Sequence, residues 1–151
     1  MTKLLIGLNL QIQKNNQLYR ELKIKIDSTI DIAKEYLRVE SILQPAIDLN
    51  NGLYESKDIL ESLIKHEYQL FTAKHSAIVT TINPYPRGTV LHLFLAGGNL
   101  EELEELYKET EEFARYQNCK SITLLGRFGW KKSFLTEYEM KPTCLQMSKE
   151  L

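Results

Sequence analysis

The chain has 151 residues, 43% of them hydrophobic, a length and composition that suit one domain with a buried core. Its net charge of -1 gives no electrostatic reason to expect nucleic acid or an anionic membrane as a partner. No apolar run reaches the roughly 20 residues that cross a bilayer, and the short apolar start lacks a small-residue cleavage site, so we expect no membrane segment and no signal peptide.

The first 26 residues predict β structure. Apolar residues alternate with other residues from Leu4 to Ile12, and they alternate again from Leu22 to Ile26. Alternation of this kind is typical of strands with one buried face. We interpret the segment as one strand or a hairpin.

Two helices are predicted next. Residues 27–28, Asp-Ser, can cap a helix whose apolar stripe runs from Ile30 to Leu43, and Pro45 should end or kink that helix because proline donates no hydrogen bond. An Asn-Asn-Gly loop follows. Ser56 can then cap a second helix that carries paired apolar residues at helical spacing.

Three strands are predicted after the helices. Residues 68–73, 77–82 and 90–96 are rich in β-branched and aromatic residues, and the turns between them are short. The segment 83–88, Asn-Pro-Tyr-Pro-Arg-Gly, reads as a rigid turn. These strands should form an antiparallel meander.

The third of these strands opens a βαβ unit. Gly97-Gly98-Asn99 breaks the strand, a helical pattern runs from Leu100 to near Asn118, and a second apolar run covers 121–125. The two strands should therefore be parallel and joined by a right-handed crossover. Ligands in such units lie at the carboxyl ends of the strands, which places the Gly-Gly-Asn turn at the candidate site.

The last part of the chain predicts a short helix and a final strand. Trp130, Phe134 and Tyr138 recur at a spacing of four, so they should share one helix face. Pro142 precedes a run at 143–148 that is suited to a strand.

The reactive side chains form no familiar catalytic or metal-binding set. Cys119 and Cys144 lack metal-ligand spacing, so we expect two reduced thiols in or near the core and no metal site. His66 and His75 flank the first hairpin strand and should be solvated.

The predicted order of elements resembles the GNAT acyltransferase fold, a mixed α/β fold with helices on both faces of the sheet. The resemblance runs from about residue 22 to the end, so we divide the chain into an N-terminal extension at 1–21 and a GNAT-like domain at 22–151. Six fragments also resemble a group of short GNAT-like proteins of tailed phages, some of which resemble a podophage internal virion protein. These fragments are Ser76–Thr80, Tyr85–Arg87, Ala96–Gly98, Ala114, Asn118-Cys119 and Gly126–Trp130.

The resemblance implies a place for acetyl-CoA. In GNAT enzymes the cofactor lies between two splayed parallel strands, with its pyrophosphate on a glycine-rich loop, Q/R-x-x-G-x-G/A, at a helix N-terminus, where backbone N–H groups and the helix dipole attract anions. The corresponding candidates in this chain are Gly97, Gly98, Asn99 and Arg127. The loop is too short for the family pattern, and the acidic residues that follow it should repel a diphosphate. These are Glu101, Glu102, Glu104 and Glu105.

The resemblance also implies catalytic positions. A tyrosine on the later helix of GNAT enzymes often protonates the leaving thiolate, but the usual spacing falls on Phe134, which has no proton to give, and Tyr138 lies one turn further on. His92, on the central strand, is the candidate base because histidine titrates near neutral pH. The alternative role for all of these side chains is packing in the core or groove. Arg127 and Trp130 could bind phosphate beside an aromatic ring, or they could simply make a tight turn with Trp130 as a core plug.

We therefore expect a catalytically degenerate GNAT-like phage protein that acts as a virion or assembly component through protein contacts. It would reside in the host cytoplasm during expression or in the virion. The alternative is an acetyl-CoA-dependent N-acetyltransferase with a divergent pyrophosphate loop. A third hypothesis is an acetyltransferase-like regulator that binds a small ligand without chemistry.

Overall fold

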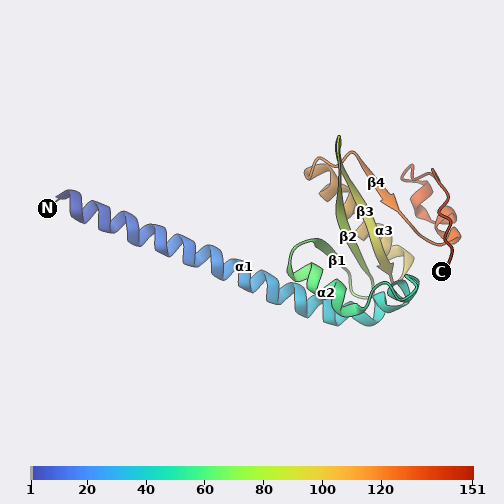
Figure 1. The fold of residues 1–151 in the computed structure, drawn as a ribbon, viewed down its shortest axis with the longest axis horizontal. Coiled ribbons are helices and arrows are strands. Elements are labelled where there is room, and N and C mark those ends of the chain that lie inside the picture. Colours follow the sequence, from blue (N-terminus) through green and yellow to red (C-terminus); the bar gives the residue numbers. More distant parts are fainter. Residues whose placement is uncertain (1) are drawn as a thin grey trace.

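The computed structural model describes the backbone of residues 2–151 and the side chains of residues 17, 18, 20 and 28–151. These described residues form helices, a single sheet and two short 3-10 helices (Figure 1). The elements are α1 (Thr2–Asp48), α2 (Ser56–Ile64), β1 (Tyr68–Thr72), β2 (Ala77–Tyr85), β3 (Gly88–Gly97), α3 (Leu100–Tyr116), β4 (Ser121–Leu124), η1 (Phe128–Lys132) and η2 (Phe134–Thr136).

The sheet has the order β1-β2-β3-β4. The first three strands pair antiparallel in sequence order, whereas β3 and β4 pair parallel across the α3 crossover. The predicted meander and βαβ unit are thus confirmed. These elements can be predicted from the sequence because the strands contain runs of β-branched residues and α3 carries an apolar stripe with helical spacing.

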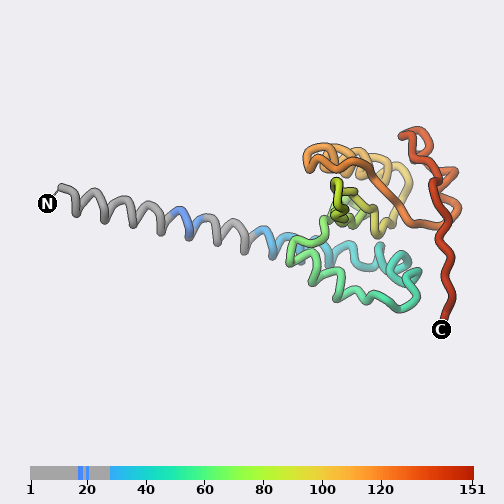
Figure 2. The backbone as a smooth tube through the Cα atoms, turned by 45° about the horizontal axis from the view of Figure 1, so that its top comes forward, coloured from blue at the N-terminus to red at the C-terminus, as the bar shows by residue number. Residues whose placement is uncertain are grey.

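Helices cover both faces of the sheet, as predicted (Figure 2). On one face, α1 and α2 bury Tyr36, Val39, Leu43, Ile47, Ile59 and Leu63 against Ala77, Val79 and Leu95. On the other face, α3 and η2 bury Leu103, Leu106, Tyr107 and Leu135 against Ile78 and Leu93. The alternation of side chains along β2 supplies apolar residues to both cores.

The strand prediction for the first 26 residues is wrong, because α1 is one helix from Thr2 to Asp48. Between Gly7 and Pro45 the sequence contains no glycine or proline, and its leucine, lysine and glutamine residues have high helix propensity. Those preferences outweigh an alternation that is only a few residues long. The helix also passes through the expected cap at 27–28, and no element ends at the proposed domain boundary near residue 22.

The helix ends differ slightly from the predictions. Pro45 lies within the last turn of α1 and the helix ends at Asp48, three residues later. The N-cap of α2 is Glu55 rather than Ser56, because Glu55 and Asp58 form a reciprocal capping box.

The β2–β3 hairpin is longer and tighter than predicted. The expected six-residue turn shrinks to Pro86-Arg87, since Tyr85 pairs with Gly88 and Pro84 pairs with Thr89. Proline fits inside β2 at this point because β1 reaches only to the level of Thr81, so no neighbour on that side needs a donor.

The final strand predicted at 143–148 does not form. The chain from residue 141 to the end belongs to no helix or strand, and all of its residues are exposed. We call this stretch, residues 141–151, the C-terminal tail. Its sequence has strand character, but nothing in the single chain pairs with it.

A bulge in β3 separates the two halves of the sheet. Val79 pairs with Leu95 and Thr80 pairs with Leu93, so Phe94 is the extra residue. Pairing between β3 and β4 ends at Leu93 and Leu124, although β3 continues to Gly97. The parallel pair therefore diverges at its carboxyl end, as the predicted splay requires.

The packing of α1 predicts a position-dependent loss of stability. Leu43 is fully buried in the α1–α2 core, whereas Leu37, six residues earlier in the same helix, is 58% exposed. We expect Leu43→Ala to lower the free energy of unfolding by about 2–5 kcal/mol because it leaves a cavity. Leu37→Ala should change it by less than about 0.5 kcal/mol. Urea unfolding of both variants checks this, and equal effects would contradict the described packing.

Candidate functional site

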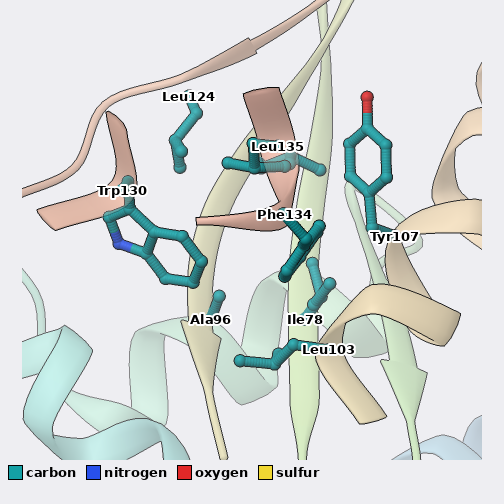
Figure 3. Close-up of a pocket in the computed structure, with 9 residues that line it drawn as sticks. Ile78, Ala96, Leu103, Tyr107, Leu124, Trp130, Phe134 and Leu135 are labelled. Carbon is teal, nitrogen blue, oxygen red and sulfur yellow. The ribbon is translucent and has the colours of Figure 1, made fainter. Parts of the chain in front are cut away.

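The carboxyl ends of β3 and β4 and the start of α3 meet at one edge of the sheet, where a ligand of this fold class would lie. The space on the α3 side of the diverging strands is a cavity of about 20 Å³. It is lined by apolar side chains that include Ala96, Leu124 and Trp130 (Figure 3). A cavity of that size holds about one water, whereas small-molecule sites measure hundreds of Å³.

Aromatic side chains fill the divergence of the strands. Trp130 and Phe134 point into the same small space beside Ala96 (Figure 3), and their rings meet edge to face with centroids 6.5 Å apart. A Cβ on Gly126 would lie 2.7 Å from Trp130 Cδ1, so the turn after β4 needs glycine there to admit the indole. This geometry favours Trp130 as a core plug over an aromatic platform.

The two glycines of the turn before α3 serve close packing. A Cβ on Gly97 would lie 2.4 Å from the carbonyl oxygen of Ile42, in the backbone of α1. Gly98 has φ +121°, and a Cβ there would lie 2.1 Å from Ser76 Oγ. The space beside the Cα atom of each glycine is therefore occupied by other parts of this chain and is not available to a phosphate.

The polar groups of Asn99 form hydrogen bonds within α3 and with the neighbouring turn. Its Oδ1 accepts a hydrogen bond from the Glu102 N–H at 2.9 Å, which makes it the N-cap of α3. Its N–H donates to Ser76 Oγ at 3.0 Å, and its carbonyl accepts from the Leu103 N–H. Three of the backbone N–H groups at the start of α3 are thus committed within the protein.

The carboxylate of Glu102 takes the place of an external anion at the α3 N-terminus. It accepts a hydrogen bond from the His75 N–H at 2.9 Å. Its hydrogen bond with the Ser76 side chain is the largest cause that lowers its pKa below the ordinary value, and the bond from His75 acts in the same direction. The helix dipole and these donors therefore already hold a negative charge. The pyrophosphate of acetyl-CoA does not fit this arrangement.

The same turn is held from the other side by α1. The Arg38 guanidinium donates to the carbonyl oxygens of Ala73 and Lys74, both at 2.9 Å, and pairs with Glu35. Residues 73–76, which we call the β1–β2 turn, are therefore fixed between α1 and the N-terminus of α3.

His92 lies on the α1–α2 face of the sheet. Its neighbours Leu91 and Leu93 are buried, Leu93 within the α3-side core, so His92 points to the opposite face. Its Nδ1 is 3.0 Å from Thr123 Oγ1 on β4. Burial lowers the pKa of His92, which keeps the ring neutral at pH 7.

Tyr138 lies on the α3 side, and its hydroxyl donates to Glu104 Oε1 at 2.9 Å. Its ring packs edge to face on Tyr107, with centroids 5.1 Å apart. Burial, and then the bond to Glu104, raise the pKa of Tyr138. The structure thus separates the two catalytic candidates, since His92 and Tyr138 lie on opposite faces of the sheet.

The last cofactor candidate, Arg127, shares an edge with the Gly-Gly-Asn turn because the carboxyl ends of parallel strands coincide. It is exposed and is the N-cap of η1, without a side-chain capping bond. Of the predicted site residues, Gly97, Gly98 and Asn99 form one cluster, and Arg127 lies at the same edge.

Sequence reasoning names Asn99 and Glu102 but misses their contacts with Ser76 and His75. Asn99 and Glu102 are spaced as in a capping box, which is a signal that the glutamate folds back over the helix start. The aromatic cluster beside the bulge has no such signal. There Phe94 contacts Tyr54 and Tyr68, with ring centroids 4.9 and 5.5 Å apart. It depends on the bulge, and a bulge is not visible in the sequence.

Cys119 is half-buried near Thr89, but Cys144 is exposed in the C-terminal tail, so the expectation of two thiols in or near the core is wrong for Cys144. Among the residues that the structure describes, no group of His, Cys, Asp and Glu side chains is arranged to bind a metal ion. Within the same part of the chain, no helix has the length and apolar character needed to cross a membrane.

Solved structures share this architecture. A probable acetyltransferase matches 78% of this chain and 95% of its own, with a TM-score of 0.58 at 12% identity. A possible acetyltransferase from Clostridium difficile 630 matches 83% and 91% (TM-score 0.55, 14% identity), and a Trypanosoma brucei acetyltransferase matches 74% and 94% (TM-score 0.51, 16% identity). No protein-family model matches the sequence, and no curated protein matches it.

This chain has a GNAT-like fold. At these sequence identities the comparison shows similarity of fold alone, and any activity depends on the residues at the site.

The close packing of Gly97 predicts that alanine destabilises the protein at this position but not at Gly129. Gly97→Ala should lower the free energy of unfolding by about 1–3 kcal/mol or more, because the added methyl meets the α1 backbone. Gly129→Ala, where a Cβ would have open space, should change stability by less than about 0.5 kcal/mol. Thermal or urea unfolding measures both, and a neutral Gly97→Ala would refute the contact.

The lowered pKa of Glu102 predicts a pH-dependent contribution to stability. Its charged form is stabilised in the fold, so the contribution is full above the ordinary value of 4.5 and is lost as the pH falls through the lower, folded value. Glu102→Gln should therefore be less stable than the parent at pH 7, and the difference should shrink as the pH falls below 4.5 and through the folded pKa. The exposed neighbour variant Glu101→Gln is the control. Unfolding curves across this pH range check the prediction, and a constant difference would contradict it.

Proposed function

We propose that this protein uses the GNAT-like fold as a protein-binding scaffold and does not hold acetyl-CoA at the start of α3. The observation that carries the proposal is the Glu102 carboxylate, which accepts the hydrogen bond of the His75 N–H where the family places a pyrophosphate. A diphosphate there would have to displace Glu102 and face Glu101 and Glu105 as well.

The filled strand divergence supports the same proposal. The pantetheine arm of a CoA would need the gap between β3 and β4, and the space on its α3 side is about 20 Å³. His92 and Tyr138, the two groups that could move protons, are separated by the sheet. A scaffold role needs none of these parts and makes use of the exposed surface instead.

A role in a phage particle is the narrower form of this proposal. Its support is the resemblance of the six sequence fragments to short GNAT-like phage proteins. Mass spectrometry of phage particles purified from a culture that produces the protein would test it, and absence of the protein from the particles would reject it.

The second candidate function is an acetyl-CoA-dependent N-acetyltransferase. Its support is the shared architecture with solved proteins described as acetyltransferases, and the comparisons favour it more directly than they favour a virion role. The splayed parallel pair is retained, and His92 is neutral and half-buried on the central strand. This function requires Glu102 and Trp130 to move when cofactor binds.

Calorimetric titration with acetyl-CoA and with CoA separates the two functions. The scaffold proposal predicts no binding heat at millimolar ligand, because Glu102 and Trp130 occupy the positions that the cofactor needs. Micromolar affinity for either ligand would overturn it and favour the acetyltransferase candidate, which an assay of acetyl transfer would then test. A thermal-shift measurement with the same ligands is the control for binding that releases no heat, since a ligand of the folded state must raise the melting temperature.

A further inference from the structure

The first half of α1 projects from the domain, and none of the other described elements lies beside it (Figure 1). Among the described side chains of α1, the first that packs against the α1–α2 core is Ile32. We call residues 2–31 the N-terminal arm, which as a helix is about 45 Å long. Leu18, in the middle of the arm, is 57% exposed. Helices in water gain most of their stability by packing an apolar face, so a partner for the arm is expected.

The sequence of the arm carries a heptad repeat, whose positions are lettered a to g and whose a and d positions are apolar. The a and d residues of the repeat are Leu5, Leu8, Ile12, Asn15, Tyr19, Leu22 and Ile26, of which only Asn15 and Tyr19 carry a polar group. The same repeat continues to Tyr36 and Leu43, which are buried in the α1–α2 core. A period of 3.5 residues suits two helices that wind around each other, whereas a helix on a flat membrane surface follows the period of 3.6. The sequence therefore predicts a helical partner along the arm.

The domain leaves room for this partner in one direction. In a parallel pair, the second α1 would run on past residue 31 into the space that the sheet and α2 occupy beside Tyr36 and Leu43. In an antiparallel pair, the second helix ends at its own N-terminus before it reaches Tyr36. The two domains then lie at opposite ends of the pair.

A second copy of the arm matches the arm in the antiparallel direction. With the two-fold axis beside residue 17, each layer pairs an a position of one copy with a d position of the other. The layers are Leu8 with Ile26, Ile12 with Leu22, and Asn15 with Tyr19. Apolar residues thus share layers with apolar residues, and the one amide of the seam shares its layer with the one hydroxyl-bearing ring. Each layer occurs twice, as two-fold symmetry requires.

The positions beside the seam agree with the same arrangement. The two copies of Leu18 would meet at the axis, which would cover an apolar side chain that is exposed in the single chain. Lys23 and Lys25 would lie beside Asn9 and Gln11 of the other copy, so no like charges face each other. An unrelated helix would have to reproduce every one of these matches, whereas a second copy has them by symmetry.

We propose that the N-terminal arms of two copies form an antiparallel coiled coil with its two-fold axis beside residue 17, which makes the protein a dimer. This register is the deepest overlap that the domains allow. An overlap one heptad longer would bring Leu5 of one copy to the level of Tyr36 in the other, where the α1–α2 core occupies the seam.

The proposal goes beyond the proposed function and does not depend on it. The arm projects away from the edge of the sheet at which Glu102 holds the start of α3 (Figure 1). A monomeric protein would leave the question of cofactor binding as it stands, and binding of acetyl-CoA would not decide whether the arms pair.

Light scattering during size-exclusion chromatography tests the dimer. The full chain of 17.6 kDa should elute with twice that mass. The double variant Ile12→Glu/Leu22→Glu should elute as a monomer, because it places charges in the apolar seam. The matched control Leu10→Glu/Ile24→Glu exchanges the same residue types at f positions, outside the seam, and should keep the dimer.

The fluorescence of Trp130 in the domain shows whether each variant is still folded, since the substituted residues lie outside both cores. A monomeric parent overturns the proposal, and so does a parent that is monomeric in solution and binds anionic phospholipid vesicles through the arm. A dimer that survives Ile12→Glu/Leu22→Glu, or an equal loss of mass in both folded double variants, also overturns it.

Distances between spin labels test the direction and the register. In a Cys119→Ser/Cys144→Ser background, one nitroxide label is attached at Lys3→Cys or at Lys14→Cys, and pulsed electron resonance measures the separation between copies. The antiparallel register places the two residues 3 about 42 Å apart along the axis and the two residues 14 about 9 Å apart. Similar short separations at both positions, as in a parallel pair, contradict the proposal, as does the lack of any separation between copies.

Discussion

The fold depends on the hydrogen bonds that the β1–β2 turn makes with α1 and with the start of α3. Ser76 is fully buried at the end of this turn, accepting the Asn99 N–H and sharing a hydrogen bond with the Glu102 carboxylate. Arg38 holds the carbonyls of the same turn from α1. Through these contacts the turn connects the helix layer on one face of the sheet to the helix on the other. Gly97 and Gly98 let the three segments approach closely enough for the bonds to form.

The contacts of this turn also limit which ligands can bind at this edge of the sheet. The N-terminus of α3 would attract an anion, but the chain supplies one in Glu102 and fixes it with the His75 N–H. The diverging parallel strands would leave a gap, but Trp130 and Phe134 fill its α3 side. The GNAT-like architecture is thus kept, while side chains of the protein itself occupy the start of α3 and the space beside the diverging strands.

The parts that sequence could predict are those set by local pattern. The runs at 77–82 and 90–96 and the stripe of α3 gave the meander and the βαβ unit, because β-branched residues and a 3.6-residue period have few other interpretations. The helix of the first 26 residues was not predicted because its apolar residues alternate over a few positions, as in a strand, although the segment has high helix propensity. The tail strand fits its local pattern, but no partner exists within the chain. At the site, the Gly-Gly-Asn turn was found, but its contacts with α1 and Ser76 depend on tertiary packing that no local pattern encodes.

The closed site also sets a condition on any ligand. An anion that binds at the start of α3 must displace the Glu102 carboxylate and break the hydrogen bonds of Glu102 with Ser76 and His75. The apparent affinity for the anion is reduced by the free energy that this displacement costs. That displacement can be confined to the Glu102 side chain, because Ser76 would keep the hydrogen bond from the Asn99 N–H and Arg38 would keep the turn in place. Protein contacts through the exposed surface require no such displacement, and this is the support that the geometry lends to the proposed scaffold.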